Sequence, residues 1–162
     1  QNMSCIKPGD SIYNRIPFRI LSDDMGNKKS CIILGGSIRQ NLPKEIKGIK
    51  VGQKCKKLGF LITAMWVKAE KGTELGKFVV HLKSGKTFEK AILNKENIDD
   101  WYIPVIDKSV KIGGKVTLPD KSERAVFASI WTNPDENDII ESFDFVSSGN
   151  AILVLISATG KN

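Results

Sequence analysis

A short stretch near the middle of the chain concentrates amide, carboxylate and aromatic groups. Its members are Asn97, Asp99, Asp100, Trp101 and Tyr102. The apolar face of a sugar ring stacks on an aromatic ring, while nearby amide and carboxylate groups hydrogen-bond the sugar hydroxyls. The stretch therefore predicts a carbohydrate-binding loop. The alternative is a buried structural corner, in which the same polar groups cap backbone turns.

Tryptophan supplies the strongest stacking surface, and the chain has 3. Trp66 and Trp131 each end an apolar run, so core packing is the simpler interpretation of both, with Trp131 kept as a candidate ligand-binding residue. Trp101 follows acidic and amide residues in a connecting segment, where binding residues concentrate. We therefore expect Trp101 to be the exposed ring that contacts a ligand.

The acidic residues around this stretch could also bind a metal ion. Glu96, Asn97, Asp99 and Asp100 offer oxygen ligands suited to calcium, but their spacing lacks the alternating donors and the later glutamate of an EF-hand loop. Turn capping is the preferred interpretation, and a structural calcium ion is the alternative. The same two interpretations apply to a second acidic group, Asp135, Glu136 and Asp138.

The cysteines predict neither a zinc site nor a compartment. Cys5, Cys31 and Cys55 are widely spaced, contain no CxxC pair and are accompanied by 1 histidine. A tetrahedral zinc site needs four closely grouped ligands, so we do not expect one. One disulfide with one thiol and three reduced thiols both fit an odd count, and the two alternatives stay open.

The sequence contains no catalytic motif of the common types, such as GxSxG, HExxH or a phosphate-binding glycine loop. His81 lies within a strand pattern, where a histidine is usually a hydrogen-bonded structural residue. A glycosidase-like carboxylate pair would have to form in space from Asp100 and either Asp144 or Glu141. We therefore expect a protein that is not an enzyme and that needs no cofactor.

The net charge of +7 arises from 25 basic and 18 acidic residues. Most of the basic residues are lysines, and they are spread over nearly every segment between predicted strands. Nucleic-acid recognition favours arginine and an interleaving of basic with aromatic residues, whereas the aromatic residues here lie in apolar strands or acidic loops. A solvated lysine-rich surface is the preferred interpretation, and no nucleic-acid partner is expected.

The elements that must position these residues are short strands. The length of 162 residues and the hydrophobic content of 41% suit one domain over residues 1–162. Residues 1–15 form an irregular lead-in, with a short strand or an edge contact expected around Ile12 and Tyr13. No run of about eighteen apolar residues occurs, so no membrane span is expected. Alternating or continuous apolar runs between glycine and proline turns predict about eight strands, at 16–21, 30–34, 58–67, 77–82, 88–92, 124–131, 139–146 and 151–156.

These strands favour an all-β, antiparallel two-sheet sandwich or jelly roll. The run at 58–67 lacks clean alternation, which is typical of a central strand covered on both faces. The segment 37–48 is predicted to be a loop, and 105–116 shows only a weak strand pattern interrupted by two glycines. The hairpin of 77–92 and the loop after it form the middle of the predicted sandwich.

Three passages resemble the galactose-binding-like β-sandwich domains that accompany glycoside hydrolases of gut and environmental bacteria. The passages are 79–86, 97–101 and 131–134 together with 140–147. They cover roughly the second half of the chain, and the first half matches only as a pattern of strands. The turn after Pro134 departs from the family pattern, because Asp135 and Glu136 stand where a second proline is common.

The resemblance implies a jelly-roll sandwich, a carbohydrate ligand and an exported location, whether extracellular, periplasmic or at the cell surface. The resulting hypothesis is a non-catalytic carbohydrate-binding module that belongs to, or acts with, an exported polysaccharide-processing system. Because a fold does not determine a function, a second hypothesis is kept. It is a protein-interaction or surface-display domain that uses the same sandwich without a sugar site.

Overall fold

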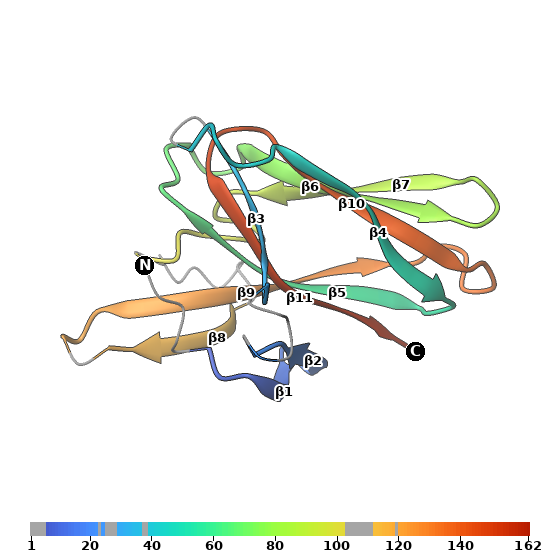
Figure 1. The fold of residues 1–162 in the computed structure, drawn as a ribbon, viewed down its shortest axis with the longest axis horizontal. Helices are drawn as coiled ribbons and strands as arrows, with labels where there is room; N and C mark the ends of the chain where they lie inside the picture. Colours follow the sequence, from blue (N-terminus) through green and yellow to red (C-terminus); the bar gives the residue numbers. More distant parts are fainter. Residues whose placement is uncertain (1–5, 23, 25–28, 37–38, 103–111, 119) are drawn as a thin grey trace.

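The computed structural model describes residues 6–22, 24, 29–36, 39–102, 112–118 and 120–162, and this part of the chain contains strands and no helix (Figure 1). The predicted all-β antiparallel sandwich is confirmed. Eleven strands occur in the described residues, against about eight predicted, because the sequence pattern did not reveal some short or exposed strands. No helix in the described part is long and apolar enough to cross a membrane.

The strands form three sheets, and neighbouring strands pair antiparallel. An N-terminal hairpin consists of β1 (Gly9–Tyr13) and β2 (Ile16–Ile20). A five-stranded sheet has the order β3-β11-β5-β9-β8, with bounds Ile32–Leu34, Ile152–Lys161, Lys57–Met65, Glu123–Thr132 and Ile112–Thr117. A four-stranded sheet has the order β4-β10-β6-β7, with bounds Glu45–Gln53, Ile140–Ser147, Glu74–Leu82 and Thr87–Leu93.

The main core lies between the two larger sheets, and phenylalanines dominate its centre. Phe60 on β5 stacks on Phe78 on β6 at a ring-centroid distance of 3.8 Å, and Phe143 and Phe145 on β10 pack against Phe78. Successive side chains of a strand point to opposite faces, so Phe143 and Phe145 are both buried while Asp144 between them faces outward. The predicted alternation of this strand is confirmed.

A second core lies on the other face of the five-stranded sheet, where the N-terminal hairpin covers it. Ile16, Phe18 and Ile20 on β2 are buried in one cluster with Leu61 on β5 and Val154 on β11. Strand β5 is therefore buried on both faces, and eight of its nine residues are buried. This double coverage explains the continuous apolar run in its sequence and confirms the prediction of a central strand.

One prediction about local structure needs correction. The segment 37–48 was predicted to be a loop, but β4 begins at Glu45. Strand β4 was hard to recognise because it is an exposed edge with left-handed backbone at Gly48 and Gly52, and the two breaks in its register with β10 disrupt the apolar alternation. In the lead-in at 1–15, the short strand expected around Ile12 and Tyr13 is confirmed as β1 over Gly9–Tyr13. Residues 1–5 and most of the weak segment 105–116 lie outside the described residues.

The two-residue turn of the N-terminal hairpin is unusual. Asn14 and Arg15 both have positive φ, at 50° and 62°, as a type I′ turn requires. Asparagine tolerates this conformation, but arginine stands where glycine is preferred. The hairpin is therefore held in place mainly by the packing of β2 on the sheet, together with hydrogen bonds from Ser157 Oγ to the Arg19 carbonyl and from Lys161 Nζ to the Arg15 carbonyl.

Two buried hydroxyls of the five-stranded sheet provide a matched test of polar satisfaction. Thr63 Oγ1 donates a hydrogen bond of 3.1 Å to the Ala125 carbonyl, whereas Ser129 Oγ is buried with no hydrogen-bond partner in the described part of the chain. We expect Ser129→Ala to leave the free energy of unfolding unchanged or to raise it, and Thr63→Val to lower it by about 1 kcal/mol. Urea unfolding measures both, and a clear loss for Ser129→Ala would contradict the account.

Candidate functional site

The stretch predicted to be a binding loop forms a buried corner against the end of β5. The Trp101 amide donates to the Ala64 carbonyl at 2.7 Å, and the Ala64 amide donates to the Asp99 carbonyl at 3.4 Å. Trp101 is 4% exposed and packs in the second core with β2 and β11. Trp101, which we expected to be exposed, therefore offers no ring face to a ligand in this conformation.

The polar side chains of the corner are hydrogen-bonded to nearby backbone. Asp100 Oδ1 accepts from the Tyr102 amide at 2.8 Å, and its Oδ2 accepts from the Val67 amide at 3.1 Å. Asp99 is 2% exposed, and its Oδ1 accepts from the Asp100 amide at 2.7 Å. Asn97 closes the turn after β7, since its side chain accepts from the Leu93 amide and donates to the Ala91 carbonyl.

These contacts match the structural-corner interpretation for Asn97, Asp99 and Asp100. Trp131 is also in the core, at 7% exposure, with its ring 5.9 Å from that of Phe88 between the two larger sheets. Tyr102 is half-buried and is the member of the predicted set whose ring reaches the surface. We name the segment from Asp99 to Tyr102 the buried corner.

Trp66, which was predicted to be core, is half-buried and lies directly beside Tyr102. The two ring centroids are 6.3 Å apart, and the ring planes are inclined at 45°. Trp66 has a φ of 52°, a left-handed conformation that is strained for a bulky residue and that persists only where its surroundings impose it. The buried corner bonds the backbone on both sides of Trp66, at Ala64 and Val67, and so holds this conformation.

A shallow hollow of about 230 Å³ lies next to Trp66 on the five-stranded sheet. It is lined by Ile33, Arg39, Asn41, Leu42, Met65, Trp66, Ile152 and Val154. Two arginines flank the rings: the guanidinium carbon of Arg39 lies 5.9 Å from the Trp66 ring centroid, and that of Arg124 lies 4.6 Å from the Tyr102 ring centroid. Such cation–π contacts hold aromatic rings in place at a surface. We call Trp66 and Tyr102 the aromatic platform.

The sequence predicted one of the two residues of the aromatic platform as a ligand-binding residue. Tyr102 was among the predicted ligand-binding residues, but Trp66 reads as the last residue of an apolar strand. Its outward turn depends on a left-handed φ, which no sequence periodicity reveals. The one local signal is that the apolar run ends at Val67, directly after Trp66, where Lys68 follows.

A separate polar cluster lies on the outer face of the four-stranded sheet. His81 Nε2 and Asp144 Oδ2 are 2.9 Å apart, and Asp144 Oδ1 accepts from the Gly48 amide at 2.8 Å. Desolvation raises the pKa of Asp144, but the hydrogen bonds from Gly48 and His81 outweigh it, and the net pKa is lowered. The prediction that His81 is a hydrogen-bonded strand residue is confirmed.

The proposed glycosidase-like pairs are not assembled in this arrangement. Asp100 bonds backbone amides at the end of β5, whereas Asp144 and Glu141 belong to β10 in the other sheet, and Asp144 points away from the core that lies between them. Among the described residues, no group of three or more His, Cys, Asp or Glu side chains is placed to hold a metal ion.

The second acidic group forms exposed contacts around turns. Asp135 pairs with Lys86 at 3.1 Å, and Glu136 pairs with Lys56 at 3.4 Å. Asp138 accepts from the amides of Ser84 and Ile139, and a hydrogen bond from the Ser84 side chain is the largest of the effects that lower its pKa. These residues therefore act as turn caps and surface ion pairs, the preferred interpretation from sequence.

The described chain defines the chemical state of Cys55. Cys55 is a free thiol, 3% exposed, and desolvation by burial raises its pKa. A buried thiol with a raised pKa is a poor nucleophile, so Cys55 acts as a small apolar core residue. Cys5 lies outside the described residues.

Truncation of Trp101 tests whether the corner is buried in solution. We expect Trp101→Ala to lower the free energy of unfolding by about 3–5 kcal/mol, because a large apolar volume is deleted and a cavity is left. Thermal melting measures the change, and the midpoint should fall by roughly 10 °C. Ile12→Ala, at an apolar side chain that is 77% exposed, is the control and should leave the midpoint nearly unchanged. An unchanged midpoint for Trp101→Ala would contradict the buried corner.

Asp144 makes the stability depend on pH in a defined direction. Its pKa is lowered in the folded state, so ionised Asp144 stabilises the fold above the unfolded pKa of about 4, and this contribution is lost as pH falls through the folded pKa. We expect Asp144→Asn to destabilise the fold at neutral pH and the difference from wild type to shrink in acid. Urea unfolding across pH 2–7 measures it, with the exposed Glu141→Gln on the same strand as control. A pH-independent difference would contradict the assignment.

Comparison of this chain with models of known protein families, with curated proteins and with solved structures finds no match in any of the three. The resemblance to galactose-binding-like domains therefore stays an expectation that rests on the three sequence passages described above. A function for the chain has to be argued from the aromatic platform and its surroundings.

Proposed function

We propose that this chain is a non-catalytic carbohydrate-binding module whose stacking surface is the aromatic platform of Trp66 and Tyr102. The observation that carries the proposal is the left-handed φ of 52° at Trp66. A strained backbone at a bulky residue is retained where the position of its side chain has a use. Here the strain presents an indole ring at the rim of a hollow instead of burying it at the end of β5.

The surroundings of the platform suit a sugar. Half-buried rings provide an apolar face for stacking, and polar groups beside them provide hydrogen bonds to hydroxyls. Arg39 and Asn41 line the hollow and are exposed, so both can reach a ligand above Trp66. The ring planes of Trp66 and Tyr102 meet at 45° and cannot lie flat on one surface. This inclination favours a single twisted glycan chain over the flat face of a crystalline polysaccharide.

The chemistry next to the platform supports binding rather than acid–base catalysis. The carboxylates of the buried corner belong to Asp99 and Asp100, and backbone amides at short distances already occupy oxygens of both. A general acid or base must be within hydrogen-bond reach of the proton it transfers. Asp99 is buried, and Asp100 uses both of its oxygens to hold the ends of the corner, so neither is available for that role.

The setting of this function follows from the resemblance noted above. A binding module of this kind would belong to, or act beside, an exported polysaccharide-processing system, and it would keep a catalytic partner close to an insoluble or extended substrate. Linking a binding module to another binding or catalytic unit raises the effective concentration of the second contact without any new interaction. The proposed location is extracellular, periplasmic or at the cell surface.

Screening on a glycan array, followed by variants at the platform, tests the proposal. We expect wild type to bind at least one class of plant, algal or host polysaccharide, and Trp66→Ala to weaken that binding by roughly tenfold or more, which corresponds to about 1.4 kcal/mol. Trp66→Phe keeps a ring and should retain part of the affinity. Lys83→Ala, in the exposed turn between β6 and β7, is the matched surface control.

Two outcomes would contradict the proposal. One is the absence of binding by wild type to every polysaccharide on the array. The other is a Trp66→Ala variant that binds as well as wild type. That result would mean that the sugar is bound without contacting the aromatic platform. Thermal melting of Trp66→Ala accompanies the binding measurement, because a half-buried ring should cost less stability than the buried Trp101.

A further inference from the structure

We propose that the open flank of the sandwich binds an extended acidic peptide, which adds as a strand to the free edge of β11. This flank lies between β11 of the five-stranded sheet and β4 of the four-stranded sheet, and it shares Ile33 with the hollow beside Trp66. We call it the flank groove. The proposal adds a polypeptide partner to the domain, and it stands or falls independently of the carbohydrate proposal.

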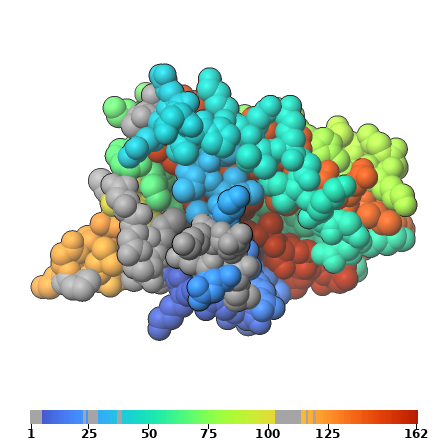
Figure 2. All heavy atoms as spheres, viewed as in Figure 1, coloured from blue at the N-terminus to red at the C-terminus, as the bar shows by residue number. Residues whose placement is uncertain are grey.

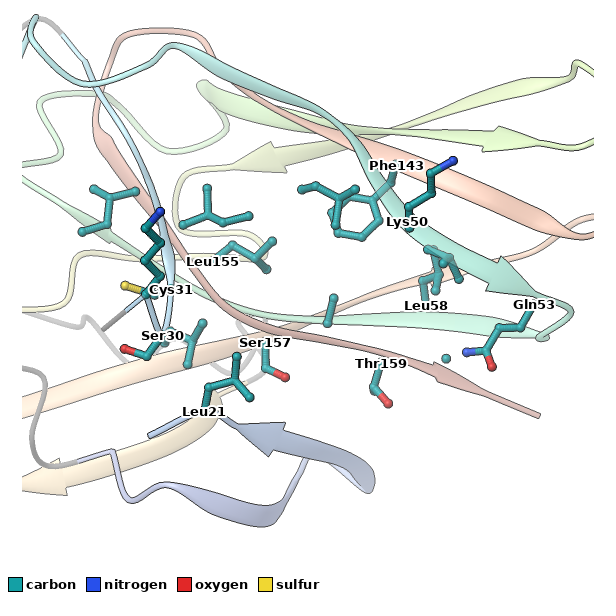
Figure 3. A pocket seen from close by; sticks show the side chains of 18 residues that line it. Leu21, Ser30, Cys31, Lys50, Gln53, Leu58, Phe143, Leu155, Ser157 and Thr159 are labelled. Atoms are coloured by element: carbon teal, nitrogen blue, oxygen red, sulfur yellow. The ribbon is translucent and has the colours of Figure 1, made fainter. Parts of the chain in front are cut away.

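The flank groove has a volume of about 710 Å³, a size within the usual range of ligand sites. Figure 3 shows Gln53 of β4 extending toward β11, whereas Lys50 lines the groove with its amine directed away from β11. Ser157 and Thr159 point to the side of β11 away from β4, where Ser157 Oγ bonds the Arg19 carbonyl. The floor of the groove is apolar and comes from core residues of three strands, Leu58, Phe143 and Leu155.

The edge of β11 provides the hydrogen-bonding groups for an added strand. Strand β3 pairs with β11 only at Leu153–Leu155, whereas β11 continues to Lys161. From Ser157 onward the register of β11 with β5 is regular, and on its other side β11 has no strand partner in the described part of the chain. Backbone amides and carbonyls of such an edge pair readily with an extended peptide.

The facing edge of β4 is unsuited to strand addition and serves as a wall. Its register with β10 breaks twice, and Gly48 and Gly52 have φ of 68° and 67°. Bulges and edge lysines are the features that protect an edge strand from pairing with another chain, and β4 carries Lys47 and Lys50 as well as the bulges. In Figure 2 the red C-terminal residues lie directly below the teal residues of β4 on the same face, so a bound peptide would run between them.

The lining of the groove defines the chemistry of the peptide. Side chains of an added strand alternate, so every second one would point onto the apolar floor and would favour an aliphatic residue. Lys29 and Lys50 line the groove, no acidic residue does so among its described lining, and the chain as a whole carries +7. The intervening residues of the peptide are therefore acidic.

Exposed apolar side chains at the mouth support a docking role. In the described chain, large hydrophobic residues are exposed at Ile12, Leu21 and Ile33, and the last two, each 39% exposed, line the flank groove. Exposed apolar groups gathered at one cavity, with polar groups at the rim, are typical of an interaction surface. A strand docked on β11 would cover part of this apolar surface.

A synthetic peptide tests the proposal. The probe alternates valine with aspartate, and its binding to the full chain is measured by fluorescence anisotropy at low salt. Amide hydrogen exchange, followed by NMR, then locates the contact. We expect saturable binding, and we expect amides in Ser157–Gly160 to become protected while those of the edge strand β7 do not change.

Three matched comparisons decide between strand addition and other forms of binding. N-methylation of alternate peptide amides removes the ladder donors and should abolish binding. Lys50→Glu should weaken binding roughly tenfold, whereas Lys83→Glu, the same charge change at a distant turn, should have a much smaller effect. Replacing each aspartate of the peptide by serine should also weaken binding.

The proposal is overturned if the peptide does not bind, if the N-methylated peptide binds equally well, or if the protected amides lie outside β11. It is also overturned if the serine peptide binds as tightly as the aspartate peptide. Sedimentation of the free chain completes the test, because a dimer whose β11 amides are already protected would mean that a second copy occupies the groove.

Discussion

The end of β5 is held by a set of backbone and carboxylate hydrogen bonds on which the rest of the candidate site depends. The amide and the carbonyl of Ala64 both form hydrogen bonds with the buried corner. The Asp100 side chain also accepts from the Val67 amide, on the other side of Trp66. These bonds stop β5 from continuing as a regular strand, so Trp66 turns outward with a left-handed backbone. The same Asp100 side chain fixes the Tyr102 amide and thereby places the second ring of the aromatic platform.

The corner can act in this way because β5 is buried on both faces. The main core covers one face and the N-terminal hairpin covers the other, and Trp101 is anchored in the second of these cores. A carboxylate in such surroundings is costly unless it is hydrogen-bonded, and one oxygen of Asp99 and both oxygens of Asp100 accept from backbone amides. The packing of Trp101 in the second core therefore depends on the hydrogen bonds of Asp99 and Asp100, and these hydrogen bonds depend on that packing.

Local patterns in the sequence predicted much of the fold and less of the site. The alternation around Phe143 and Phe145 and the continuous run of β5 both identify strands, since burial on one or two faces leaves a direct trace in residue type. The bulged edge strand β4 leaves no such trace. Nor could the order of strands in each sheet be predicted, because pairing joins residues far apart in sequence, such as β5 with β11.

Local sequence patterns could not predict the exposure of the candidate site residues. The Asn97–Tyr102 stretch was recognised as special, and its two interpretations, binding loop and structural corner, use the same residue types. What separates them is whether Trp101 meets solvent or the β2 side chains, and that depends on the docking of the N-terminal hairpin some eighty residues earlier in the chain. The flank groove could not be predicted from the sequence for a similar reason. It lies where β11 continues beyond the much shorter β3, and that pairing joins residues far apart in the chain.

Amide hydrogen exchange at Val67 and Tyr102 tests the central claim, that Asp100 clamps the end of β5, most directly. In wild type both amides should exchange slowly, close to the rate of the β5 amide of Ile62. In Asp100→Asn, which replaces one accepting oxygen by a donor group, protection should fall at one or both of these amides while Ile62 stays protected. Exchange of Val67 and Tyr102 at the rate of an unstructured peptide in wild type would show that the clamp does not exist in solution.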